Sequence, residues 1–136
     1  DVSKENTLSF SITAQNEVML NDKPVAVEDI RRRIVDFVRM RGAQHLILVD
    51  ANPASDYNTY FTLENEIVAA YAEVRNAEAK RRYHRDYASC TDEQRKKVRD
   101  IYPQHLSETY NTAEVNNSTE DNKTSKAVDE KKGGAE

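Results

Sequence analysis

The sequence predicts a small α+β domain in which helices pack on one face of a mixed sheet. Three observations lead to this fold class. Apolar and polar residues alternate over 8–12, an apolar stripe with helical spacing covers 27–41, and an uninterrupted apolar run follows at 45–49. Strand and helix signals thus alternate along a chain of 136 residues, a length that suits one domain.

The first element is predicted to be a β-hairpin. Leu8, Phe10 and Ile12 alternate with serines and a threonine, as in a half-buried strand. A short apolar segment at 18–20 is the second strand. Asn16 lies in the turn between them and tolerates the left-handed conformation that tight turns require.

A helix is predicted over 27–41. Its acidic residues lie in the first turn and its arginines in the last, which suits the helix dipole. Gly42 follows as a C-cap. The apolar stripe consists of Val27, Ile30, Ile34, Phe37 and Val38.

The apolar run at 45–49 predicts a central strand that helices cover on at least one face. Asp50 ends this strand. A long helix begins near Tyr57, with Asn58 or Thr59 as its N-cap. Its apolar face includes Tyr60, Leu63, Ile67, Tyr71 and Val74.

Residues 75–102 are predicted to form a helical extension. The apolar pattern fades after Ala77, so this part is expected to project from the body as a polar segment. Thr91 and Gln94 have the spacing of a capping box and open a short helix that ends before Pro103. A short strand at a sheet edge follows at 104–108, and residues 111–136 are too polar to fold alone.

The sequence carries no pattern that predicts catalysis, a metal or a cofactor. The histidines at 45, 84 and 105 lie in different elements and match no metal-binding spacing. His45 is interpreted as structural and His84 as solvated. Cys90 could be a nucleophile at a helix N-terminus, but an ordinary loop cysteine explains it better because no histidine is placed to activate it. Gly42 is the only glycine before residue 133, which rules out a phosphate-cradling loop.

Charge leaves one alternative function open. The formal net charge is −4, so the whole chain has no nucleic-acid footprint. The segment 80–99 is rich in lysine and arginine, with Tyr83 and Tyr87 among them. It could bind an anionic polymer, or it could be a solvated helical pair.

Together, the elements and their residues resemble the periplasmic domain of the ExbD/TolR family of biopolymer transport proteins. The resemblance covers about residues 8–109. It rests on the hairpin 18–25 before a Val-Glu-Asp-Ile helix start, the strand 46–49 ending in Asp50, the loop to Tyr57 with the helix segment 65–71, and the segment 101–108. Two departures from the family pattern are the extension 75–102 and the absence of the membrane helix that carries the family's essential aspartate.

The resemblance implies a periplasmic domain of an inner-membrane, single-pass protein that is not an enzyme. Residues 1–7 would then be a linker after a removed membrane anchor, and 8–110 the domain. The implied partners are an ExbB/TolQ-like proton channel and a TonB- or TolA-like protein, and the implied assembly is a homodimer. The alternative is a soluble adaptor, or a module that binds an anionic polymer or the cell wall through 80–99.

The predicted interaction site is an exposed sheet edge, where strand addition joins partners through backbone hydrogen bonds. The expected edge is either 104–109 or the first hairpin. Asp50 and Tyr57 match loop and helix-start positions of the family and are interpreted as structural. The candidate interface residues are Gln104, His105, Leu106, Ser107 and Glu108.

Overall fold

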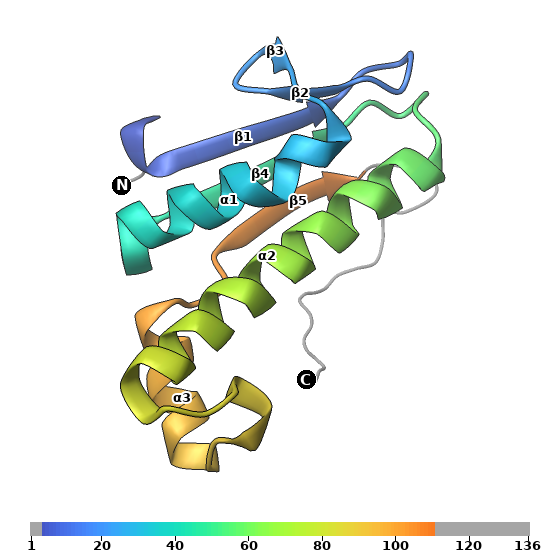
Figure 1. The fold of residues 1–136 in the computed structure, drawn as a ribbon. Coiled ribbons are helices and arrows are strands. Elements are labelled where there is room, and N and C mark those ends of the chain that lie inside the picture. Colours follow the sequence, from blue (N-terminus) through green and yellow to red (C-terminus); the bar gives the residue numbers. More distant parts are fainter. Residues whose placement is uncertain (1–3, 111–136) are drawn as a thin grey trace.

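The computed structural model describes residues 4–110 and confirms the α+β fold class, with helices on one face of a five-stranded mixed sheet (Figure 1). Its strands are β1 (Thr7–Ile12), β2 (Val18–Leu20), β3 (Lys23–Pro24), β4 (Leu46–Ala51) and β5 (Leu106–Tyr110). Its α-helices are α1 (Val27–Arg41), α2 (Tyr57–Tyr83) and α3 (Asp92–Ile101), and short 3-10 turns are η1 (Lys4–Asn6), η2 (Gly42–Gln44) and η3 (Tyr87–Ser89).

The strand order in the sheet is β3-β2-β1-β4-β5. The hairpin strands β1 and β2 are antiparallel, as are β2 and β3, whereas β1, β4 and β5 are mutually parallel neighbours. Each parallel connection contains a helix, and short connections alone could not make it. The sheet therefore ends in the small hairpin strand β3 on one side and in β5 on the other.

The predicted hairpin and first helix are confirmed. Asn16 has φ 66° in the turn between β1 and β2, the left-handed conformation expected of it. The helix α1 spans the predicted residues, and Gly42 follows it with φ 59°. Local sequence signals were sufficient here because each depends on only a few neighbouring residues.

The strand prediction for 45–49 is right in place, since β4 lies between β1 and β5. The helices cover only one face of it. Ile47, Val49 and Ala51 are buried against the helices, whereas Leu46 and Leu48 are partly buried on the opposite face. The continuous apolar run thus reflects an interior strand that is covered fully on one side.

The predicted N-cap of the second helix is wrong by two or three residues. Asp56 caps α2, and its carboxylate accepts a hydrogen bond from the Thr59 backbone N–H at 2.8 Å. Asn58 and Thr59 already lie inside the helix, which begins at Tyr57. Asp56 satisfies a backbone donor that the first turn would otherwise leave unpaired.

One hydrophobic core fills the space between the sheet and the two long helices. It combines alternate residues of β1 and β4 with the inner faces of α1 and α2. Its most completely buried members are Phe10, Ile12, Ile30, Ile34, Ile47, Leu63 and Ile67.

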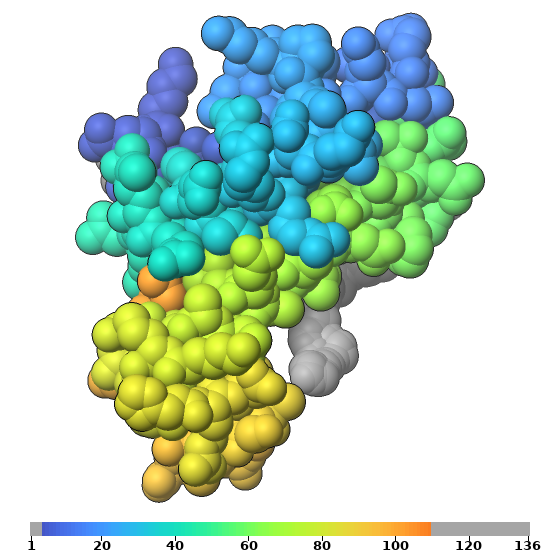
Figure 2. Space-filling view, viewed as in Figure 1, coloured from blue at the N-terminus to red at the C-terminus, as the bar shows by residue number. Residues whose placement is uncertain are grey.

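The helical extension projects from this body as predicted, and it forms a separate lobe in the space-filling view (Figure 2). It is not only polar, because Ala79, Cys90 and Val98 bury one another in a second small core. The predicted capping box of Thr91 and Gln94 is present at the start of α3.

Among residues 4–110, no helix is long and apolar enough to cross a membrane. Within the predicted linker, Lys4–Asn6 form η1 and Thr7 begins β1. The predicted disordered segment 111–136 lies outside the described residues.

Candidate functional site

The candidate site is the outer edge of β5, where the sheet ends with five residues of extended backbone. Among residues 4–110, β5 pairs with β4 only. The opposite edge, β3, has two residues, a lysine and a proline. Short strands, lysine and proline are the usual means by which proteins block a sheet edge. Of the two edges predicted as interaction sites, β5 is therefore the one that offers backbone groups.

The register of β5 tells which of its peptide groups face outward. The Ile47 N–H donates to the His105 carbonyl at 2.9 Å, and Ile47 is the partner of Leu106. In a parallel ladder, alternate residues direct both peptide groups toward the neighbouring strand. The N–H and C=O of Ser107 thus face β4, and those of Leu106 and Glu108 face away from the sheet.

A buried polar network fixes the start of β5 to the body. His45 is 1% exposed, and its Nδ1–H donates to the Gly42 carbonyl at 2.7 Å. That tautomer leaves Nε2 as an acceptor for the Tyr71 hydroxyl at 2.5 Å. The Tyr71 oxygen also accepts a backbone hydrogen bond from His105, and the His105 Nδ1–H donates to the His45 carbonyl at 3.2 Å.

Burial disfavours the charged forms of His45 and Tyr71. It lowers the pKa of His45, and the nearby charges of His105 and Arg75 lower that pKa further against the opposing bond to Gly42. Burial also raises the pKa of Tyr71, so its hydroxyl remains a donor. Arg75 crosses from α2 to donate to the Tyr102 carbonyl at 3.1 Å. The network thus joins η2, α2 and the approaches to β4 and β5.

The contact between His45 and His105 was not predicted from the sequence, which placed them in different elements. Their rings lie 5.5 Å apart because β4 and β5 are parallel neighbours that begin at the same end of the sheet. The helix α2 runs along this side of the sheet (Figure 1), as its contacts to His105 and Tyr102 require. The prediction that His45 is structural fits its place in the network.

A second feature beside β5 was missed by sequence reasoning. The flank of α2 on the β5 side exposes Tyr57 by 55%, Phe61 by 50% and Val68 by 57%. The Tyr57 and Phe61 rings stack with centroids 5.9 Å apart. These residues are spaced at i, i+4 and i+11, so the signal was present as a second stripe next to the core stripe. We call these three residues the α2 flank.

Glu64 lies on the same side of α2 as this flank. Burial raises the pKa of its carboxyl group, against the effect of a hydrogen bond from Tyr60. Its Oε2 is shielded from solvent and has no hydrogen-bond partner in the described part of the chain. A shielded carboxylate oxygen without a donor is costly in a folded protein.

The two family-matched positions lie in different layers. Asp50 is exposed on the helix-free face of β4, opposite Ser11 on one side and Thr109 on the other. Tyr57 begins α2 in the helix layer. They do not form a joint site. Tyr57 is a helix-start residue as predicted, but the turn assignment of Asp50 is wrong, because the pairing with β1 and β5 carries β4 through Asp50 to Ala51.

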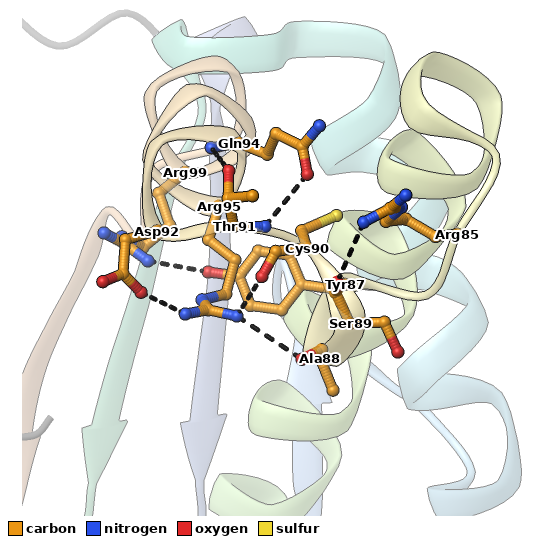
Figure 3. Close-up of polar contacts among 10 residues, drawn as sticks. All are labelled: Arg85, Tyr87, Ala88, Ser89, Cys90, Thr91, Asp92, Gln94, Arg95 and Arg99. Atoms are coloured by element: carbon orange, nitrogen blue, oxygen red, sulfur yellow. Dashed lines mark hydrogen bonds and ion pairs between the residues drawn. The ribbon is translucent and has the colours of Figure 1, made fainter.

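The basic side chains of the helical extension form hydrogen bonds and ion pairs within the extension (Figure 3). Arg99 donates to the Tyr87 hydroxyl at 2.9 Å, and Arg95 donates to the Cys90 carbonyl at 2.5 Å and contacts Asp92. Arg81 and Arg82 bind the buried Glu78, while Lys80 and Lys96 pair with Asp86 and Asp100. Most basic side chains of 80–99 therefore already have an oxygen partner within the extension.

Cys90 is buried in the small core of the extension and is 5% exposed, beside Ala79 and Val98. Its burial favours the structural interpretation over that of a nucleophile. Within residues 4–110, no group of histidine, cysteine and acidic side chains has the arrangement of a metal site.

Comparison with known proteins leaves the family open. No protein-family model matches the chain, and no curated protein matches it either.

Proposed function

We propose that this chain is a protein-interaction domain of the ExbD/TolR type, and that it works by strand addition at the β5 edge. One observation carries the proposal: β5 presents outward peptide groups of Leu106 and Glu108, whereas the other sheet edge is blocked by Lys23 and Pro24. The occupant of the edge would be an extended segment of a partner, or a second copy in a homodimer.

In the wider assignment, the domain lies in the periplasm and belongs to a single-pass inner-membrane component without catalytic activity of its own. An ExbB/TolQ-like channel supplies the proton-driven motion, and the domain passes force to a TonB- or TolA-like protein. The order hairpin, helix, strand, long helix, short helix, strand supports this assignment, since it is the order on which the resemblance rests. The gene offers a direct test: we expect about 20 apolar residues interrupted by one aspartate ahead of Asp1. A hydrophilic extension there would favour the soluble adaptor.

Strand addition can be tested with a short β-forming peptide, Thr-Val-Thr-Lys-Thr-Val-Thr, added to the isotope-labelled chain. We expect the amide signals of β5 to shift on titration, and Leu106→Pro to abolish the shift because proline removes an outward N–H. Glu108→Pro is a second variant that leaves the core contact of Leu106 in place. Lys23→Thr at the blocked edge is the control. It keeps the Lys23 backbone N–H that faces β2 and should bind as the unmodified chain does. Binding that survives both β5 prolines would overturn the proposal.

A further inference from the structure

The β5 edge and the α2 flank together define what an added strand would meet. A strand paired with β5 directs alternate side chains to the helix side of the sheet. On β5 itself, Leu106 packs against the core and marks that side, so Glu108, two residues later, shares it. The side chains of the added strand would therefore point toward the exposed flank residues Phe61 and Val68.

Glu64 adds a carboxylate to a surface that is otherwise apolar. Apolar side chains of the added strand suit the α2 flank, but the Glu64 carboxylate has an oxygen without a donor. A lysine or arginine would supply that donor through a charge-assisted hydrogen bond. No basic residue of the described chain does so.

A second copy of the chain fits this surface poorly. In a continuous sheet formed from two β5 strands, the twofold axis brings Glu108 of each copy to the same side of the seam. The two Glu64 carboxylates lie on that side as well. Like charges on neighbouring strands are destabilising. Here the Glu108 and Glu64 carboxylates of the two copies would lie near one another with no lysine or arginine side chain between them.

We propose that the β5 edge takes an extended segment of another protein that places a lysine or arginine between apolar residues on the helix side, where its cation binds Glu64. This inference rests on strand addition at β5 as the proposed function. It adds that Glu64 selects the occupant and that a second copy is disfavoured.

The test compares three peptides of the same length on the full chain: Thr-Val-Thr-Lys-Thr-Val-Thr and its variants with norleucine or glutamate at the central position. We expect the lysine peptide to bind about tenfold more tightly than the norleucine peptide at low salt, and the glutamate peptide to bind weakest. The preference for lysine should shrink in about 0.5 M sodium chloride.

Glu64→Gln should remove the preference for lysine while the norleucine peptide keeps its affinity, a ratio that a general loss of structure would not produce. Glu66→Gln is the matched control, because Glu66 pairs with Arg31 at 3.0 Å on the opposite flank of α2. It removes the same charge and should leave the preference intact.

Equal binding of the lysine and norleucine peptides would overturn the inference and leave strand addition standing. If none of the peptides shifts the β5 amides, the proposed function itself fails. Concentration-dependent shifts of these amides without peptide would assign the edge to a second copy. Stronger shifts with a peptide of residues 111–136 would assign it to the chain's own C-terminal segment, and either outcome would overturn the inference.

Discussion

The two edges of the sheet differ in length, in composition and in what lies above them. β3 has two residues and contains Pro24, which cannot donate a backbone hydrogen bond. β5 has five residues without proline or lysine, and the α2 flank lies on its side of the helix layer. One small sheet is thus closed at one edge and open at the other.

The two edges also differ in how they are held. β3 belongs to a local hairpin, and its pairing partner β2 is separated from it by a two-residue turn at Asn21 and Asp22. β5 is far along the chain from β4 and is fixed by the buried network of His45, Tyr71 and His105. The open edge thus depends on tertiary contacts that can be broken one at a time.

The largest expected effect is on the free energy of unfolding, and it distinguishes peptide groups of β5 that face β4 from those that face away from the sheet. Ser107→Pro removes an N–H that faces β4 and leaves the carbonyl of Ile47 unpaired, so we expect it to lower the free energy of unfolding by about 3 kcal/mol. Glu108→Pro removes an outward N–H and should cost clearly less. Urea denaturation of both variants measures the difference. Equal losses would mean that the register of β5 is not the one described.

Tyr71→Phe tests the anchor of β5. It deprives His45 Nε2 and the His105 N–H of their partner, and we expect a loss of about 2 kcal/mol in unfolding free energy. Amide hydrogen exchange should speed up in β5 before β1. The same hydroxyl removal at Tyr83, which packs on the separate small core of the extension, should leave the exchange rates of β5 unchanged. Uniform exchange in both strands would argue against a local anchor.

A third effect depends on pH. Burial lowers the pKa of His45 in the folded chain, so the unfolded chain binds the proton more readily. The contribution of His45 to stability is therefore complete above about pH 6.5 and is lost as pH falls through its lowered folded pKa, by up to about 1.4 kcal/mol per pH unit. Urea midpoints measured from neutral pH downward should show this slope. His45→Gln should flatten it, whereas His84→Gln, at an exposed position, should not.

The smallest expected effect concerns Glu64. Since burial raises the pKa of its carboxyl group, the ionised form opposes folding above that pKa, and stability should increase as pH falls through it. Glu64→Gln should then stabilise the chain by about 1 kcal/mol at neutral pH. Thermal unfolding of this variant and of Glu66→Gln measures the difference. A gain in stability together with a loss of lysine preference would identify a residue kept for binding at a cost to the fold.

Elements with local signals could be predicted from the sequence almost to the residue. The helix α1 carries its apolar stripe, its charges and its glycine cap within one segment, and α3 carries its capping box in Thr91 and Gln94. The cap of α2 was placed too late because Asp56, Asn58 and Thr59 are all good capping residues. Only the chain direction entering the helix decides among them.

The candidate site was predictable only in part. The segment 104–108 was identified as an edge strand near its true bounds, but the sequence left the hairpin edge as an equal alternative. Glu64 and Phe61 were not identified, because the second stripe of α2 gains its meaning only from the position of β5, which the sequence does not give. The pairing of His45 with His105 likewise depends on β4 and β5 being neighbours.

By itself, the sequence determined the α+β class, the hairpin, the extent of α1 and α3 and the place of an interior strand. These features follow from periodicity and capping, which act over a few residues. The tertiary structure alone decided that β5 lies at the outer edge with Leu106 and Glu108 facing outward, and that the α2 flank and Glu64 accompany it. Strand order and register arise from contacts between distant segments, and such contacts leave no periodic trace in the chain.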